Sequence, residues 1–406
     1  ASSEDPGEQP SEGFLSKVKG KLTNGLKKLV GKTEEPEEAA KLDPASQVEK
    51  TEPKFGLAIS GSSAVNLGGL NTKAYVVDGT VELTGGQRPL AIRAINNSQV
   101  LATSGAAALS RAKNPSSQFS VGIAGSMACN DLLNKTAAEM INTDVAGASQ
   151  VAVQALAGGQ QVAVALGLGV NASADQDTAA SAAGSVSVNT VTNLVTATVQ
   201  DSELAGQDGG SNRHLDITAY DRTKVGTGGG SLIAGGKAGL GAAITYSEID
   251  GTAGAYLSGT QISGFDLLQV HGLTASLIGS AGAMGGYTIG DESGTFGGVV
   301  AINKIDRHTE AVVDGAAITG GDIDILAKDV NAATSLDSLI DEGEEQLADE
   351  LDYTGSEVFT DDTGLAGTSI ISVAGVAQAS GNNVGISFAW NEIGNDFRAL
   401  VKDSKI

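Results

Sequence analysis

Apolar and polar side chains alternate with a period of two along much of the chain after residue 54. The alternation is most regular at residues 74–76, 90–94, 151–155, 215–219 and 323–325. A period of two places successive side chains on opposite faces of a β-strand. Glycine pairs occur between these stretches, at Gly85/Gly86, Gly158/Gly159, Gly209/Gly210, Gly235/Gly236 and Gly320/Gly321. The pattern predicts many strands of four to six residues joined by glycine turns.

Six segments of the chain share one pattern, and each is anchored on a polar residue. The anchors are Asn66, Asn130, Asn189, Ser247, Asn303 and Asn391, at successive spacings of 64, 59, 58, 56 and 88 residues. An apolar residue precedes every anchor, and alanine follows every anchor after eight residues. Larger apolar residues follow after ten and fifteen residues in all six segments. These fixed offsets establish an internal repeat.

Short strands with glycine corners, repeated at this interval, predict a right-handed parallel β-helix. Each repeat would supply two or three coils, stacked about 4.8 Å apart. The predicted fold class is therefore all-β, with one solenoid of six repeats over residues 55–406 and an incomplete last repeat. A β-propeller blade is the competing interpretation of a repeat of this length, but blades carry more aromatic residues and antiparallel hairpin turns.

Two segments lack the repeat. Residues 1–54 hold eleven acidic and nine basic residues, and apolar side chains recur there at helical spacing opposite lysines. This predicts a Lys-rich amphipathic helix at 14–30, which would lie on a membrane, dock on an acidic partner or cap the solenoid. Residues 335–363 hold eleven acidic and no basic residues, and subtracting these 29 from the 88-residue spacing leaves 59. They are predicted to form an acidic helical insertion in a solenoid loop.

The amino-acid composition predicts a narrow interior, and the net charge limits the classes of partner. The 406 residues include 56 glycines and only 4% aromatic residues, whereas 41% are hydrophobic. Such small side chains suit a narrow interior rather than several wide cores. The net charge of −23 argues against nucleic acid as a partner, because phosphates require clustered Lys and Arg. The single cysteine, Cys129, excludes an internal disulfide, and its apolar position predicts a buried structural thiol.

The anchors are the first candidates for a functional constellation. Asn side chains stacked on successive coils would bond to one another and to the backbone as a structural ladder. The alternative is a row of amides that bind a ligand. Ser247 would put a shorter polar group into the ladder, with some loss of continuity.

Metal binding has weaker support. Asp175 and Asp177 form one carboxylate pair at a spacing of two, and Asp322 and Asp324 form another. Each pair would face one way from a strand, so all four residues are weak calcium candidates. The alternative is a solvated strand face.

Catalysis has little support. The three histidines, His214, His271 and His308, belong to different repeats and are expected at the surface. No zinc spacing or P-loop is present. We therefore expect no catalytic residues, no cofactor except possible calcium, and no enzymatic activity.

Two segments resemble a known family. GGVVAINKIDRHTEAVVDGAAITGGDIDI (297–325) and FGLAISGSSAVN (55–66), followed by TKA (72–74), are similar to repeats of leukotoxin-like, filamentous haemagglutinin-type exoproteins. The resemblance implies a β-helical adhesin passenger that Gram-negative bacteria secrete or display at the cell surface. The expected function is the structural and adhesive shaft of a fibre. The alternatives are a self-assembling extracellular filament subunit and, less favoured, a β-helical carbohydrate-active enzyme.

The resemblance also suggests partners. Neighbouring solenoid chains, the rest of a longer parent chain, and host or other cell surfaces are the expected ones, and nucleic acid is not. Because the chain starts without an initiator Met or a signal peptide, we expect a processed form or an excerpt.

Overall fold

The structure is a computed structural model that describes residues 55–85, 88–111, 119–172, 179–207, 209, 213–289, 293–330, 368–379 and 381–406. Every helix and strand element in this part of the chain is a β-strand. Several predictions fall outside the described residues: the charged segment 1–54 with its helix at 14–30, the helical insertion at 335–363, and the calcium candidates Asp175 and Asp177.

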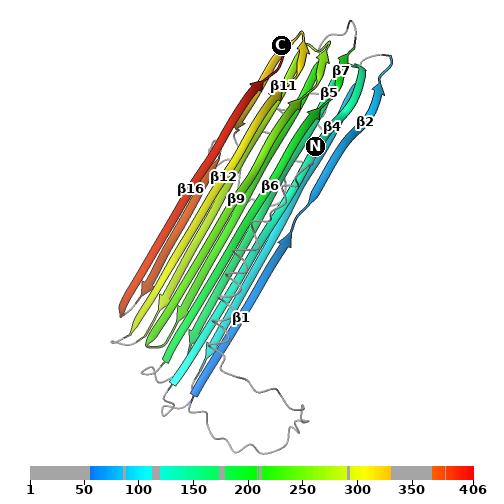
Figure 1. The fold of residues 1–406 in the computed structure, drawn as a ribbon. Coiled ribbons are helices and arrows are strands. Elements are labelled where there is room, and N and C mark those ends of the chain that lie inside the picture. Colours follow the sequence, from blue (N-terminus) through cyan, green and yellow to red (C-terminus); the bar gives the residue numbers. More distant parts are fainter. Residues whose placement is uncertain are drawn as a thin grey trace, which may run out of the picture. The chain divides into compact units, whose positions relative to one another are not determined.

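The strands form two sheets, here called sheet A and sheet B. Sheet A contains β1 (Phe55–Gly68), β2 (Asn71–Glu82), β4 (Phe119–Ala148), β6 (Ala179–Gln200), β9 (Ala238–Ser258), β12 (Gly294–Asp314) and β16 (Asn382–Lys402), with short strands β7 (Glu203–Gly206), β10 (Gln261–Ser263) and β13 (Ala317–Thr319). Sheet B contains β3 (Pro89–Ser110), β5 (Gln150–Asn171), β8 (His214–Ala234), β11 (Leu267–Tyr287), β14 (Asp322–Asp329) and β15 (Ser369–Ala379). Figure 1 shows the long strands lying side by side.

All strand pairs are parallel, and the six anchors stand next to one another in sheet A. Asn66 pairs with Asn130 and Asn130 with Asn189, and the series continues through Ser247, Asn303 and Asn391. One repeat therefore makes one coil, with one long strand in each sheet, and the prediction of two or three coils per repeat was wrong. The parallel pairing is compatible with a parallel β-helix or solenoid.

Strand length explains that error. β6 has 22 residues and β9 has 21, instead of four to six. Gly158 and Gly159, predicted as a turn, lie inside β5 and pair with Arg222 and Thr223 of β8. Alternation has the same period in a short and in a long strand, and an extended glycine does not interrupt pairing. The predicted turn at Gly235/Gly236 is present, with φ values of 77° and 84°.

A corner recurs twelve residues after every anchor, where the backbone enters the left-handed region. The residues at this corner are Asp78, Asn142, Asp201, Gly259, Gly315 and Asp403, with φ between 48° and 65°. Asp, Asn and Gly are the residue types that adopt this conformation most readily. The corner ends β6, β9, β12 and β16, whereas β2 and β4 continue through it at Asp78 and Asn142.

In the last coil, β14 and β15 both pair with β11. The β14 pairing ends at Asp329 opposite Thr274, and the β15 pairing begins at Ser369 opposite Leu277. The backbone N–H of Thr368 donates to Asp329 Oδ2 at 2.7 Å. The two strands thus occupy successive parts of one row of sheet B, with residues 331–367 between them in the sequence.

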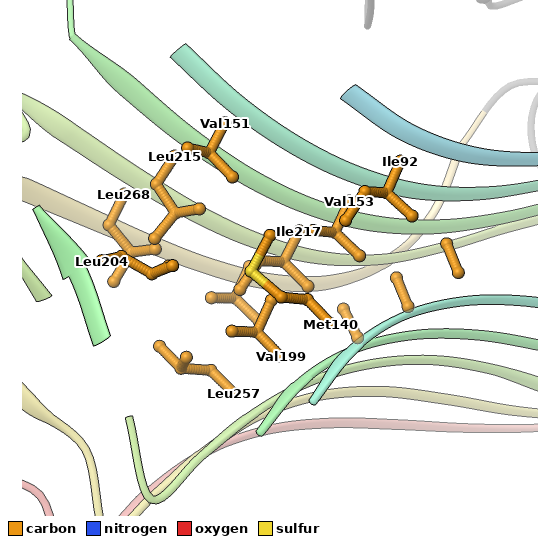
Figure 2. Close-up of a cluster of buried hydrophobic side chains, with 14 of the residues drawn as sticks. Ile92, Met140, Val151, Val153, Val199, Leu204, Leu215, Ile217, Leu257 and Leu268 are labelled. Carbon is orange, nitrogen blue, oxygen red and sulfur yellow. The ribbon is translucent and has the colours of Figure 1, made fainter. Parts of the chain in front are cut away.

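The anchor row divides the strands into two halves. The uncharged half comprises residues 55–66, 119–130, 179–189, 238–247, 294–303 and 382–391 of sheet A and 100–110, 161–171, 225–234, 278–287 and 370–379 of sheet B, which contain no Asp, Glu, Lys, Arg or His. The charged half is the rest of the long strands. Its interior holds the main core cluster, which includes Met140, Leu204, Leu215, Ile217 and Leu257 (Figure 2).

The interior of the uncharged half is built from smaller side chains. Two of its clusters have only alanine as buried members: Ala102, Ala128, Ala163 and Ala165 in one, and Ala106, Ala108 and Ala124 in the other. A third cluster contains Ile233, Met284 and Val299. The narrow interior expected from composition is found in this half, whereas large aliphatic side chains fill the other.

Candidate functional site

The anchor residues form a ladder of side-chain amides between the two sheets. Asn66 Nδ2 donates to Asn130 Oδ1 at 2.9 Å, and Asn130 Nδ2 donates to Asn189 Oδ1 at 2.7 Å. Asn130 and Asn189 are fully buried. The structure thus brings these three predicted residues into direct contact.

The same amides connect the two sheets. The Nδ2 groups of Asn66, Asn130 and Asn189 also donate to backbone carbonyls of sheet B: Leu101 at 2.9 Å, Val162 at 2.9 Å and Gly226 at 2.7 Å. An amide nitrogen carries two protons, so one can follow the ladder while the other crosses to the facing sheet. Both protons are used within the protein, which favours a structural role over ligand binding.

The ladder is interrupted at Ser247. The Ser247 hydroxyl pairs with the Thr227 hydroxyl instead of reaching the next coil. As a result, Asn303 Oδ1 is buried without a hydrogen-bond partner. The ladder resumes beyond the gap, where Asn303 Nδ2 donates to Asn391 Oδ1 at 2.8 Å.

A second polar row lies four residues after the anchors, and the sequence interpretation missed it. Asn134 Nδ2 donates to Asn193 Oδ1 at 3.0 Å. Asn193 Nδ2 in turn donates to Asp221 Oδ1 at 3.0 Å and to Thr223 Oγ1 at 2.7 Å, both on sheet B. The signal for this row was available, because three of the six repeats carry Asn at that offset, the third being Asn395.

A buried ion pair completes this row. Arg307 of β12 and Asp221 of β8 pair between the two sheets, and both side chains are fully buried. Arg307 follows Gly251 of β9 in the row, and a Cβ atom at Gly251 would lie 1.9 Å from the Asn193 carbonyl oxygen. The backbone of Asn193 therefore allows only glycine at this position, and the Arg307 guanidinium also donates to the Asp250 carbonyl at 3.1 Å. A buried charge held by hydrogen bonds on both sheets restricts their relative register.

Two of the four calcium candidates, Asp322 and Asp324, lie at the end of sheet B. Both are exposed, and Asp324 Oδ2 is 2.9 Å from His271 Nε2, so this carboxylate is paired with a histidine. Within the described residues, no group of three or more His, Cys, Asp or Glu side chains is placed to hold a metal ion. The structure therefore gives Asp322 and Asp324 no further metal ligands.

The other two calcium candidates are Asp175 and Asp177. Asp175 lies outside the described residues, and so does Asp177, because the description stops at residue 172 after β5 and resumes at residue 179 with β6. Calcium binding by Asp175 and Asp177 therefore stays a prediction.

Of the three histidines expected at the surface, His271 is buried, so that prediction was wrong for it. Its side chain is 11% exposed because β11 is an inner strand, with β8 and β14 on either side. His308 and His214 are both half-buried. Cys129 is buried and free, as expected, and burial, followed by the nearby charge of Asp131, raises the pKa of its thiol.

The outer face of sheet A carries a charged network in the charged half. His308 Nε2 lies 2.7 Å from Glu310 Oε1, and His308 Nδ1 lies 3.1 Å from Asp396 Oδ2. The Tyr256 hydroxyl donates to Glu310 Oε2 at 3.0 Å. Partial burial alone would raise the pKa of Glu310, but the hydrogen bonds from His308 and Tyr256 lower it below its usual value. Burial, together with the Glu310 contact, raises the pKa of Tyr256.

The fold and these sites define an all-β protein of two parallel sheets with a buried polar ladder between them. No family model, no curated protein and no solved structure matches the chain. Among the described residues, no helix has the length and apolar character needed to cross a membrane.

Proposed function

We propose that the protein is the structural and adhesive shaft of a secreted or surface-displayed bacterial fibre, built as a right-handed parallel β-helix. The observation that carries the proposal is the continuous register of the six anchors across sheet A. In-register parallel coils hydrogen-bond along one axis, so the shaft keeps loops and insertions at fixed distances. The resemblance to haemagglutinin-type exoproteins supports the same function.

Two measurements on the full chain test this proposal. Electron microscopy should show stiff particles of uniform length, and fluorescently labelled chain should adhere saturably to host cells. Particles without a defined axis would argue against the shaft, and adherence that never saturates would argue against the adhesive role.

A self-assembling filament subunit is the second candidate, and the polarity of the ladder favours it. All three ladder bonds, from Asn66, Asn130 and Asn303, run toward higher residue numbers, so Asn66 Oδ1 accepts no ladder bond and Asn391 Nδ2 donates none. A second copy could continue the ladder by donating from Asn391 to Asn66 of its neighbour. Sedimentation over a range of concentrations distinguishes the candidates, because a filament grows with concentration and a shaft does not.

A further inference from the structure

The outer faces of the uncharged half are apolar on both sheets. Most of the large hydrophobic side chains that are exposed among the described residues lie there. On sheet A they include Ile59, Phe119, Leu240, Phe296, Ile386 and Trp390, and on sheet B Leu101, Leu109, Leu166, Leu232, Tyr287 and Val373. Soluble surfaces rarely expose contiguous apolar patches larger than a few hundred Å². The outer faces of both sheets in the uncharged half therefore favour contact with an apolar environment over contact with water.

The interior of the same half is the more polar side. Ser110 and Ser120 hydroxyls bond at 2.6 Å across the two sheets, and Thr245 bonds to Ser280 at 3.2 Å. Ser62 bonds to Ser104 at 2.7 Å. In this half, hydroxyls and mostly small apolar side chains lie inside and large apolar side chains lie outside, whereas the charged half has large aliphatic side chains inside and ion pairs outside. This arrangement suits a protein segment whose surroundings are less polar than its interior.

The dimensions of the apolar band match a lipid bilayer. Its strand segments are ten to twelve residues long, which at about 3.3 Å per residue gives about 33–40 Å. The hydrocarbon core of a bilayer is about 30 Å thick. A protein partner would have to cover both faces at once, whereas lipid surrounds an inserted segment on every side.

Charged residues border the band at both margins. On the anchor side, four of the six first outward positions of sheet A are charged, namely Asp131, Glu248, Lys304 and Glu392, and the other two are Leu67 and Thr190. At the other margin, Arg111 follows β3 and Lys237 precedes β9. Uncharged strands between charged margins are what a bilayer selects.

Aromatic side chains gather near the same margins. Tyr246 and Trp390 occupy the outward position just before the anchor row, and the Tyr246 hydroxyl donates to Glu248 Oε2 at 2.7 Å. Phe119, Tyr287 and Phe296 lie near the opposite margin, where the strands of the band begin or end. Tyr and Trp favour the boundary between lipid and water because one end of each ring system is polar.

We propose that the uncharged half inserts into the apolar core of a lipid bilayer, with lipid acyl chains covering both outer faces. The charged half then stays in water. The proposal rests on side chains of sheets A and B and is independent of the predicted helix at 14–30. It is also separate from the fibre function, because a shaft could be anchored or unanchored.

Insertion has a consequence for the sheet edges. Among the described strands, β16 pairs only with β12, and β1 pairs only with β4. Backbone groups at an open edge cannot remain unpaired in hydrocarbon. We therefore expect the inserted form to contain more than one copy, with these edges paired between copies.

The chain contains its own reporter of insertion. Trp390 is the only tryptophan, and it is 54% exposed on the outer face of β16. The full chain should be mixed with large unilamellar vesicles of zwitterionic phosphatidylcholine. We expect the protein to float with the vesicles, the Trp390 emission to shift to the blue, and brominated acyl chains to quench it, equally at low and high salt.

Matched variants locate the binding surface. Leu166→Glu and Leu240→Glu put one charge on each outer face of the band, where both leucines are 56% exposed. Each should weaken vesicle partitioning about tenfold or more, since charges are costly in the apolar core. The control is Leu194→Glu, an exposed outward leucine of the charged half, which should partition like the wild type. Thermal melting in the absence of vesicles verifies that all variants fold.

Several outcomes would overturn the proposal. One is failure to float with phosphatidylcholine vesicles. Another is binding that requires anionic lipid and disappears in salt, which would assign it to the lysines of residues 14–30. A blue shift that follows protein concentration without lipid would assign the faces to a second copy. Cross-linking that finds only single copies on the vesicles would exclude insertion and leave surface adsorption.

Discussion

The charged and uncharged halves of the coils share strands, register and backbone pairing, yet they distribute side chains in opposite ways. In the charged half, Leu215 and Ile217 are fully buried, whereas Lys304 pairs with Glu248 and Asp306 on the outer face. In the uncharged half, Ser187 and Thr245 are buried, whereas Leu166 is exposed. Parallel pairing therefore tolerates either alternation. The side chains decide which surroundings each half prefers.

The two halves also differ in what stabilises them. A buried Leu or Ile contributes about 1.5–3 kcal/mol of hydrophobic stabilisation, but Ala and Ser contribute much less. The uncharged half relies instead on close approach of the sheets. A Cβ atom built on Gly167 would lie 2.5 Å from the Gly184 carbonyl oxygen. Removing a large buried side chain should therefore be harmful in the charged half, and adding a methyl group to a glycine should be harmful in the uncharged half.

The largest effect is expected in the charged half, for Arg307→Leu. Removing the guanidinium leaves the buried Asp221 carboxylate without an opposite charge, with hydrogen bonds from only Asn193 and Thr223, which should lower the free energy of unfolding by about 3–5 kcal/mol. Urea denaturation measures the change. Lys304→Met is the control, because its ion pairs are on the surface and contribute about 1 kcal/mol or less. Equal losses in the two variants would contradict the distinction.

The boundary between the halves is tested by Asn189→Leu. The substitution leaves the Asn130 amide and the Gly226 carbonyl without this partner, and each unpaired buried group costs about 1–3 kcal/mol. Chemical denaturation should show the loss, whereas Thr190→Leu on the opposite face should be near neutral. An Asn189→Leu variant as stable as the wild type would refute the ladder as a source of stability.

Close packing in the uncharged half is tested by Gly167→Ala. The added methyl group meets backbone rather than a movable side chain, so we expect a loss of about 1–3 kcal/mol in thermal or urea unfolding. Gly105→Ala on neighbouring β3 has no atom within 4 Å of its new methyl group and should be tolerated. Similar stability of both variants would show that the sheets can separate at little cost.

A gain of stability is expected for Ser247→Asn. The longer amide would accept from Asn189 and donate to Asn303 Oδ1, which has no partner in the wild type. One added hydrogen bond should contribute about 0.5–1.5 kcal/mol, measured as a higher urea midpoint. A lower midpoint would mean that the Thr227 contact of the serine outweighs a continuous ladder.

The smallest effect concerns pH and the outer network of the charged half. The pKa of Glu310 is lowered by folding from the ordinary value of 4.5. Its contribution to stability is therefore fully present above about pH 4.5 and is lost as the pH falls through the lower folded value. Melting curves of wild type and Glu310→Gln should differ at pH 7 and converge in acid. A difference that persists at low pH would exclude this contribution.

The sequence pattern could predict the repeat, because register in a parallel stack requires like residues at fixed offsets. It could not predict the length of the coil. The alternation around Gly158 and Gly159 has the same period in one 22-residue strand as in two short ones, and only pairing with β8 shows that β5 is continuous. The second polar row was missed although Asn134, Asn193 and Asn395 share one offset, because other repeats carry Gly251 and Arg307 there and the partner of Arg307, Asp221, lies on the facing sheet.

By itself, the sequence determined that strands would form and which residues would stand in one row, because a two-residue period and a constant repeat are local properties of the chain. Only the tertiary structure decided which side of each strand faces inward. Alternation in the uncharged half is as regular as in the charged half, and a period of two does not distinguish an apolar interior from an apolar exterior. The facing sheet resolves this, since the amides of three anchors meet the carbonyls of Leu101, Val162 and Gly226 between the two sheets.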